Sequence, residues 1–346
     1  MNEILTPILA QLTRGTELSA GAIEAAMGEL FEGRVSDVQA AAFIVALRTK
    51  GETEDELGGL VHAMYRYGTP VEVPEGAIDT CGTGGDRSGT INASTMAARI
   101  AAGAGARVVK HGNRAASSQA GSADVLEELG VAIEIGPAAV AQCVAEAGVG
   151  FCFAPRYNPA MRFLGPARKE IGVPTTFNFL GPLANPARVR RQAVGVSDAA
   201  MATRMLGVLR ELGTTRAMVF SGDDGLDELT TTTTSTVHEL VDGRLHAYSI
   251  DPLDVGIARA DSAQLVGGNA ATNAAMLGAV LAGEKGPHRD LAVLNGAAAL
   301  MVAGVAPDLV SGIEAAGAAL DNGAAARALE TLVRVSRAAR DAEAEA

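Results

Sequence analysis

The sequence predicts an α/β protein with a small N-terminal all-helical lobe and a large lobe, in which a mostly parallel central sheet is flanked by helices. Two observations predict this fold class. Apolar residues recur at helical spacing through residues 3–66 without a strand pattern, and from Ile78 onward short apolar runs alternate with helix-like runs. Such alternation is typical of parallel sheets with helices on their faces. We therefore expect the helical lobe over residues 1–70 and the α/β domain over residues 71–346.

The helical lobe contains two sequence signals for helix starts. Ser36-x-x-Gln39 and Thr53-x-x-Glu56 each fit a capping box, in which side chains satisfy the free N–H groups of the first turn. A proline-containing stretch at residues 68–76 predicts a linker to the large lobe. Residues 155–186 hold six prolines and several apolar side chains that need burial. We expect parts of about 160–186 to cross back and join the helical lobe in space.

The large lobe is predicted from its alternating runs. The candidate strands are Ile78, Val108–Val109, Val131–Ile135, Val149–Phe153, Gln192–Val196, Ala217–Phe220 and Ala292–Leu294. The candidate helices are Ser94–Ala102, Pro137–Ala147 and Ala199–Leu212. Ligands of such sheets usually bind at the carboxyl ends of the strands, so the loops that follow strands are the expected binding positions.

Composition limits the classes of protein that the chain can belong to. The net charge of −12 argues against a general nucleic-acid binder, although a local basic pocket remains compatible with it. Three cysteines without CxxC spacing favour a reduced, cytoplasmic compartment. The N-terminus lacks a basic n-region, and no apolar run is long enough to span a bilayer, so we expect no membrane partner. We also find no sequence signature of acyl-enzyme or zinc chemistry.

The first Gly-rich loop follows the candidate strand at Ile78 and contains Gly82, Gly84 and Gly85. Glycines let backbone N–H groups approach an anion, and the start of the next helix adds a partial positive charge. The loop closes on more hydrogen-bonding side chains than a helix cap requires: Asp86, Thr90, Asn92, Ser94 and Thr95. It therefore predicts a phosphate cradle, and the alternative is a bare tight turn. Cys81 beside it is expected to be a packed thiol.

The second loop lies about 25 residues further along and combines Lys110, His111 and Arg114 with Ser117, Ser118 and Ser122. Lysine binds phosphate as a point charge and arginine binds it with two parallel hydrogen bonds. A solvated surface turn is the alternative for this loop taken alone. Two loops of this chemistry together predict a ligand with more than one phosphate group.

An acidic pair, Asp227 and Glu228, follows the candidate strand Ala217–Phe220. Adjacent carboxylates on such a loop suit Mg²⁺, a hard cation that prefers oxygen ligands and often bridges to substrate phosphates. Taken alone, the pair also fits a solvated acidic turn. The threonine-rich run that follows, residues 230–236, is assigned no chemistry.

The two loops resemble the GTGGD and KHGNR motifs of the anthranilate phosphoribosyltransferases, a family that shares its fold with the pyrimidine nucleoside phosphorylases. Residues 79–86 and 110–114 carry these motifs, and residues 39–64, 168–186 and 225–236 resemble further parts of the family. The resemblance covers most of the chain. It implies transfer of a phosphoribosyl group from phosphoribosyl pyrophosphate (PRPP) to the amine of anthranilate in L-tryptophan biosynthesis.

The resemblance also implies site residues, although none is assigned as a general acid or base. PRPP would be held by Gly82, Gly85, Asp86, Thr90, Asn92, Ala93, Ser94, Thr95, Lys110, His111, Gly112, Asn113, Arg114, Ala115, Ala116, Ser117, Ser118 and Ser122. Anthranilate would contact Gly82, Asn113 and Arg168, with Arg168 pairing its carboxylate. Two Mg²⁺ ions would be bound with Ser94, Asp227 and Glu228 as ligands. The family further implies a homodimer formed through the helical lobe.

Three positions depart from the family pattern. Asn158 stands where histidine is common, and Arg87 and Ile91 stand where glycine and phenylalanine are common. The first departure concerns a secondary contact to anthranilate, and the other two concern the mobility of the first loop. Two alternative functions remain open on the sequence: a pyrimidine nucleoside phosphorylase of the same fold, and a non-catalytic relative that binds nucleic acid or another polyanion.

Overall fold

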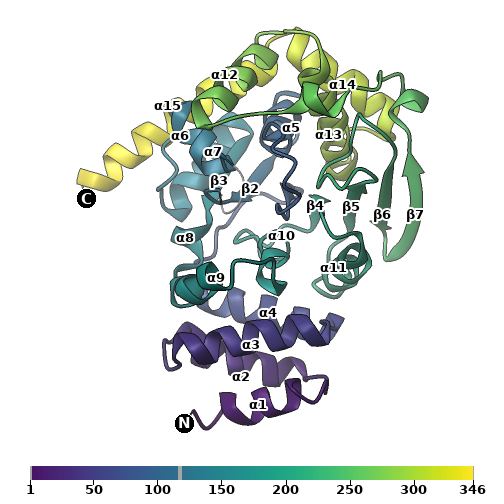
Figure 1. Ribbon diagram of the computed structural model, residues 1–346. Helices are drawn as coiled ribbons and strands as arrows, with labels where there is room; N and C mark the ends of the chain where they lie inside the picture. Colours follow the sequence, from purple (N-terminus) through teal and green to yellow (C-terminus); the bar gives the residue numbers. More distant parts are fainter. Residues whose placement is uncertain (1, 116–118, 346) are drawn as a thin grey trace.

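The computed structural model describes residues 2–115 and 119–345, and it shows a helical lobe below a larger α/β lobe (Figure 1). The helical lobe is built from α1 (Leu5–Leu12), α2 (Ala20–Phe31), α3 (Asp37–Lys50) and α4 (Glu54–Tyr67). Ser36 caps α3 and Thr53 caps α4, each through a complete capping box with the residue three positions on. Both predicted helix starts are therefore confirmed, because a capping box is a local signal that depends little on the rest of the fold.

The large lobe contains a five-stranded sheet in the order β1-β4-β5-β6-β7 and a second, parallel pair of strands. The sheet consists of β1 (Asp79–Gly82), β4 (Arg191–Gly195), β5 (Arg216–Gly222), β6 (Ser235–Val241) and β7 (Arg244–Ile250). The pair consists of β2 (Val108–Gly112) and β3 (Val149–Phe153), and a bridge between Ile78 and Val108 joins it to β1. Strands β1, β4 and β5 are parallel, whereas β6 and β7 form an antiparallel hairpin, so the predicted mostly parallel sheet is confirmed.

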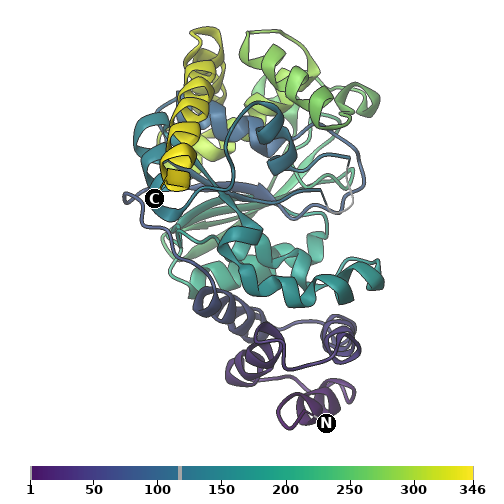
Figure 2. The same ribbon diagram turned by 90° about the vertical axis from the view of Figure 1, so that its left-hand side faces the viewer.

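Helices cover the sheet on both faces (Figure 2). One face carries α5 (Ala93–Gly103), α7 (Pro137–Ala147), α13 (Pro287–Ala303), α14 (Leu309–Asp321) and α15 (Ala324–Glu345), whereas α11 (Ala199–Glu211) lies on the face toward the helical lobe. A separate hydrophobic core lies on each face of the sheet, and neighbouring strand residues point alternately into one and the other. Ala193 and Met218 pack into the core on the side of α5 and α13, whereas Val194 and Val219 pack into the core on the side of α11. Two short helices, α6 (Ser122–Glu128) and α12 (Ala270–Leu281), pack on each other beyond the first face.

The proline-rich segment runs between the lobes as a series of short helices. These are α8 (Ala154–Tyr157), η1 (Pro159–Leu164), α9 (Gly165–Ile171), η2 (Thr176–Asn178) and α10 (Leu180–Leu183). Leu164, Phe179 and Leu183 belong to the same hydrophobic cluster as the helices α1–α4. This cluster supports the expected crossing over 160–186, and the division of the chain at residue 70 stays a prediction.

Two predicted strands are wrong. Residues 131–135 form no strand, because the run lies between α6 and α7, and its Ala132 N–H donates to the Ser336 hydroxyl of α15 at 3.0 Å. Residues 292–294 lie inside α13, which is buried along most of its length and therefore apolar on every side. The hairpin β6–β7 was not predicted from the sequence, because β7 is exposed along most of its length and so lacks the continuous apolar run of a buried strand.

The remaining elements connect the hairpin to the C-terminal helices. They are the short 3₁₀ turns η3 (Pro252–Val255) and η4 (Ser262–Leu265). In the part of the chain that the structure describes, no helix is both long enough and apolar enough to cross a bilayer.

Candidate active site

Both Gly-rich loops emerge at the carboxyl ends of neighbouring strands. The first leaves β1 at Gly82 and runs into α5, and the second leaves β2 at Gly112. The backbone of the first loop needs residues that tolerate the left-handed region, since Gly84, Gly85 and Arg87 have φ values of 67°, 86° and 56°. The two loops therefore occupy the position expected for a ligand site at this edge of the sheet.

Lys110 joins the two loops. Its Nζ donates to the Thr80 carbonyl oxygen at 2.6 Å and to the Ser94 hydroxyl at 3.2 Å, so a side chain from β2 reaches the start of α5. The side chain is buried, and burial lowers the pKa of Lys110 while the charge of Asp79 opposes this shift. A cation is thus held where both loops meet, and its partners in this contact are neutral oxygens.

The acidic pair packs directly against the first loop. Asp227 Oδ2 accepts a hydrogen bond from the Gly84 N–H at 2.7 Å, and Glu228 Oε1 accepts one from the Ser94 N–H at 3.0 Å. The second of these N–H groups lies in the first turn of α5, where donors are free and the helix dipole favours negative charge. The predicted metal ligands and the predicted phosphate cradle therefore form one site, although 143 residues separate Gly84 from Asp227.

Two glycines make this close approach feasible. A side chain at Gly82 would collide with the Asp227 carboxylate, and one at Gly195 in β4 would collide with the Asp227 carbonyl oxygen. Gly195 was not predicted to take part, and its role depends on β4 lying between β1 and β5. The strand order of the sheet thus brings the acidic loop over the first Gly-rich loop.

The carboxylates of the acidic pair have raised pKa values. Burial, followed by the charge of Asp86, raises the pKa of Asp227 to about 7. Burial and the charge of Asp227 raise the pKa of Glu228 well above its usual range. Buried like charges are costly unless a cation or proton neutralises them.

The donor chemistry fits Mg²⁺. Among the described residues no group of three or more His, Cys, Asp or Glu side chains could serve as a complete metal cage. Mg²⁺ does not require one, because it commonly takes one or two carboxylates and completes its shell with water and substrate phosphates. Asp227, Glu228 and the Ser94 hydroxyl offer the hard oxygen donors that this coordination uses.

The rest of the first loop is held by polar contacts within the large lobe. Asn92 donates to the Ala120 carbonyl oxygen at 3.1 Å and accepts from Asn273 of α12 at 2.8 Å, so it ties the first loop to the far end of the second. Asp86 accepts from the Ser88 hydroxyl at 2.6 Å, and Thr90 bridges to Val266. Of the other predicted residues, Ala93 and Thr95 are buried in the first turn of α5.

His111 connects the second loop to the segment between the lobes. Its Nδ1 lies 2.9 Å from the Gly181 carbonyl oxygen, which requires the proton on this nitrogen, and its Nε2 can then accept from Asn158 at 3.4 Å. Burial lowers the pKa of His111, which keeps the ring neutral. Asn158 therefore contacts the second loop through His111. This is the contact made here by the asparagine at a position where the family commonly has histidine.

The later part of the second loop packs against α6. Arg114 forms ion pairs with Asp124, at 3.0 Å, and with Glu127, and its guanidinium lies 5.4 Å from the Phe153 ring centroid. Ala115 N–H also donates to Asp124, and the Ser122 hydroxyl donates to the Asn113 carbonyl oxygen at 3.4 Å. Gly112 has the Ser122 hydroxyl and Phe151 packed against it. The predicted residues Ala116, Ser117 and Ser118 lie outside the described residues.

Arg168 lies in α9, and among the described residues no hydrogen bond or ion pair connects it to either loop. Its guanidinium lies 5.8 Å from the Phe177 ring centroid, and burial lowers its pKa. A half-buried guanidinium without a carboxylate partner within the described part of the chain is well suited to receive a carboxylate ligand.

Sequence reasoning missed Ser197, which holds the first loop from the side of β4. Its N–H donates to the Thr83 hydroxyl at 3.2 Å and its hydroxyl donates to the Gly84 carbonyl oxygen at 2.8 Å. The pair Ser197-Asp198 before the helix Ala199–Glu211 carries a helix-start signal that could have drawn attention to it. Asn273 carries no comparable local signal.

Comparison with known proteins agrees with this geometry. The α/β domain model of a glycosyl transferase family matches residues 75–326, and the helical bundle domain model of the same family matches residues 6–68. An anthranilate phosphoribosyltransferase from a Nocardioides species is 53% identical over 331 residues, which cover 94% of this chain and 97% of that enzyme. The chain belongs to the anthranilate phosphoribosyltransferase family. The family and the enzyme class predicted from the two loops are therefore confirmed.

Other anthranilate phosphoribosyltransferases support the same conclusion. The enzyme from Salinispora arenicola is 50% identical, with 96% of this chain and 97% of that enzyme covered. The crystal structure of the Thermus thermophilus enzyme superposes with a TM-score of 0.90 at 40% identity, over 95% of this chain and 99% of that one. A yeast enzyme, 23% identical and also with a TM-score of 0.90 over 98% of this chain and 99% of that one, shares the fold.

Proposed function

We propose that this chain transfers the phosphoribosyl group of PRPP to the amine of anthranilate, giving N-(5-phosphoribosyl)anthranilate and pyrophosphate, as a step of L-tryptophan biosynthesis. The observation that carries the proposal is the meeting of Gly84 and Ser94 N–H groups with Asp227 and Glu228, next to the cation of Lys110. A nucleoside phosphorylase using inorganic phosphate would have no need of this pairing of a metal-binding carboxylate pair with a polyphosphate cradle.

The leaving group of this reaction is a polyanion, and the chain is equipped to stabilise it. Loop N–H groups, the N-terminus of α5 and Lys110 would stabilise the charge that develops on the pyrophosphate as the bond to the ribose carbon breaks. Mg²⁺ bound at Ser94, Asp227 and Glu228 would supply further charge neutralisation of the leaving oxygens. The second loop, from Lys110 to Ser122, would hold the phosphoribosyl part.

The acceptor side needs orientation more than proton transfer. Arg168 would pair with the anthranilate carboxylate, while Gly82 and Asn113 would contact the ring and amine. An arylamine is neutral at pH 7, so its nitrogen lone pair is available without a strong base. Catalysis would then depend mainly on positioning and electrostatics, which agrees with our assigning no general base.

The proposal includes two Mg²⁺ ions, a homodimer and a cytoplasmic location. A yeast relative was solved in complex with PRPP and Mg, which supports Mg²⁺ use. The homodimer would form through the helical lobe, as the family resemblance implies.

A fluorescence assay of anthranilate consumption tests the proposal. With PRPP and Mg²⁺ the fluorescence of anthranilate should fall, and chelation of Mg²⁺ should stop the loss. The paired variant Asp227→Asn and Glu228→Gln should weaken the Mg²⁺ dependence of turnover. Absence of consumption by the intact chain, combined with cleavage of thymidine in phosphate buffer, would instead favour the phosphorylase.

A further inference from the structure

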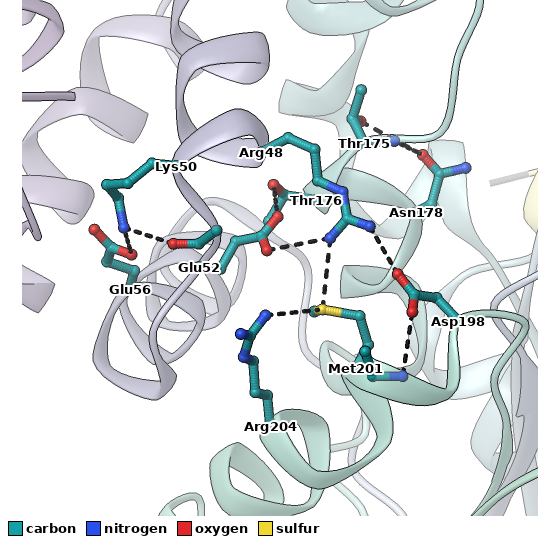
Figure 3. Close-up of polar contacts among 12 residues, drawn as sticks. Arg48, Lys50, Glu52, Glu56, Thr175, Thr176, Asn178, Asp198, Met201 and Arg204 are labelled. Carbon is teal, nitrogen blue, oxygen red and sulfur yellow. Dashed lines mark hydrogen bonds and ion pairs between the residues drawn. The ribbon is translucent and has the colours of Figure 1, made fainter. Parts of the chain in front are cut away.

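The two lobes meet at a polar junction around Arg48, near the end of α3 (Figure 3). Its Nη2 donates to Asp198 Oδ2 at 2.8 Å, and its Nη1 donates to Glu52 Oε2 at 3.2 Å. The guanidinium also lies 5.2 Å from the Phe179 ring centroid. One side chain of the helical lobe therefore contacts Asp198 of the large lobe and Phe179 of the connecting segment, besides Glu52 of its own lobe.

The first branch of this junction leads to the acceptor side. Glu52 is buried, and its second oxygen accepts a hydrogen bond from the Thr176 hydroxyl in η2. The next residue, Phe177, lies beneath the guanidinium of Arg168. Glu52 and the Phe179 ring thus fix the short turn on which the proposed clamp for the anthranilate carboxylate rests.

The second branch leads to the donor side. Asp198 caps α11 by accepting from the Ala200 N–H through Oδ1, which leaves Oδ2 for Arg48. Its neighbour Ser197 holds the first Gly-rich loop through Thr83 and the Gly84 carbonyl oxygen. A displacement of Asp198 would therefore move Ser197, the residue before it, and with Ser197 the first Gly-rich loop that contacts Asp227.

We infer that Arg48 is a positioning residue that sets the donor loop and the acceptor clamp relative to each other, through Asp198 and Glu52 respectively. This inference rests on the proposed function of the site. The forked guanidinium is what the role requires, since its two Nη atoms reach different carboxylates, whereas an ammonium group presents a single nitrogen. The nearby Lys50 has no such role, because it pairs with Glu56 inside the helical lobe.

The contact between Arg48 and Asp198 is suited to positioning more than to stability. The two side chains are 31% and 37% exposed, and ion pairs this accessible contribute little to the free energy of unfolding. Their removal is therefore expected to leave the fold intact. A small displacement of a substrate-holding loop, by contrast, has a large effect on rate.

The test uses Asp198→Asn. Asparagine still caps α11 well, but it lacks the negative charge that forms the ion pair with Arg48. We expect KM for PRPP to rise about three- to tenfold, while KM for anthranilate changes less. The matched control is Asp308→Asn, because Asp308 caps α14 by accepting from the Ser311 N–H at 2.8 Å and has no cation partner among the described residues. This control should leave both KM values unchanged.

A second variant, Arg48→Lys, perturbs both branches at once. It should raise KM for both substrates, since one ammonium group cannot serve Asp198 and Glu52 together. Combined with Asp198→Asn it should raise KM for PRPP no further than Arg48→Lys alone, because both changes break the same contact. A thermal unfolding midpoint close to that of the unmodified chain would show that these effects are not a loss of fold.

The inference is overturned if Asp198→Asn matches Asp308→Asn in both KM values, or if the effects of Arg48→Lys and Asp198→Asn multiply. Either result would leave the proposed function standing, because the unmodified chain would still consume anthranilate. Failure of the unmodified chain to turn over PRPP would instead reject the proposed function.

Discussion

Gly195 offers a sharp test of how the sheet assembles the site. It ends β4, between β1 and β5, and the backbone of the acidic loop crosses directly over it. A Cβ at this position would lie far inside contact distance of the Asp227 carbonyl oxygen and 3.2 Å from the Glu228 N. Gly195→Ala must therefore push the acidic loop away from β4, since backbone atoms cannot rotate aside as a flexible side chain can.

The size of the effect follows from this displacement. Relieving the overlap requires a shift of about 1 Å or more, and a misplacement of that size in a reacting site can cost about a hundredfold in rate. Overpacking of this kind typically lowers the free energy of unfolding by about 1–3 kcal/mol. We expect the Gly195→Ala enzyme to fold and to need much more Mg²⁺ for half-maximal turnover, because Asp227 and Glu228 move together.

The assay is a Mg²⁺ titration of anthranilate consumption at saturating PRPP, with thermal unfolding measured in parallel. Gly278→Ala is the matched control, because this glycine lies in α12 with nothing near its missing side chain, and the substitution favours helix by about 1 kcal/mol. A folded Gly195→Ala enzyme with unchanged turnover and Mg²⁺ dependence would refute the view that the acidic loop must sit against β4.

Three further perturbations test separate parts of the site. Arg168→Ala should raise KM for anthranilate about tenfold or more and KM for PRPP much less, and equal effects would reject its carboxylate role. Burial lowers the pKa of His111, so the intact chain loses free energy of unfolding as pH falls below about 6.5, the pKa of histidine in the unfolded chain, by up to about 1.4 kcal/mol per pH unit. The variant His111→Gln should therefore lose less stability in acid. Parallel pH profiles of unfolding for the two proteins would contradict this. Thr232→Val should weaken Mg²⁺ use by several fold, because the Thr232 hydroxyl donates to Asp224 at 2.5 Å beside the acidic pair; an unchanged Mg²⁺ titration would count against this bracing role.

Local signals in the sequence predicted those parts of the fold that depend on neighbouring residues. The capping boxes at Ser36 and Thr53, the helix Pro137–Ala147 and the strand Val149–Phe153 all agree with the structure. Short apolar runs gave wrong strand predictions where the residues are apolar because they are buried and not because they pair in a sheet. Residues 292–294 are apolar because α13 is enclosed by other helices, and periodicity alone cannot distinguish such a run from a buried strand.

The sequence predicts the kind of chemistry that this site would perform, and this stays a prediction, whereas the way in which the two segments meet could not be predicted. Glycines, hydroxyl groups and Lys110 mark an anion site in the sequence because each loop is short and local. The contact of Asp227 with Gly84 depends on the order β1-β4-β5, which places a loop from the third strand over one from the first. No residue pattern within either segment encodes that order.

The N–H groups that we propose as an anion cradle in the first loop also donate hydrogen bonds to carboxylates. Gly84 and Ser94 donate to Asp227 and Glu228, so an incoming pyrophosphate group would meet both the engaged donors and two negative charges. Lys110 supplies one positive charge beside Ser94. Because like charges in a buried site repel strongly, the donor substrate and Mg²⁺ must enter the site together or the carboxylates must take up protons. Under the proposed function, the acidic pair would exclude metal-free polyanions from the cradle as well as hold Mg²⁺, and this selectivity would follow from the contact of the two segments.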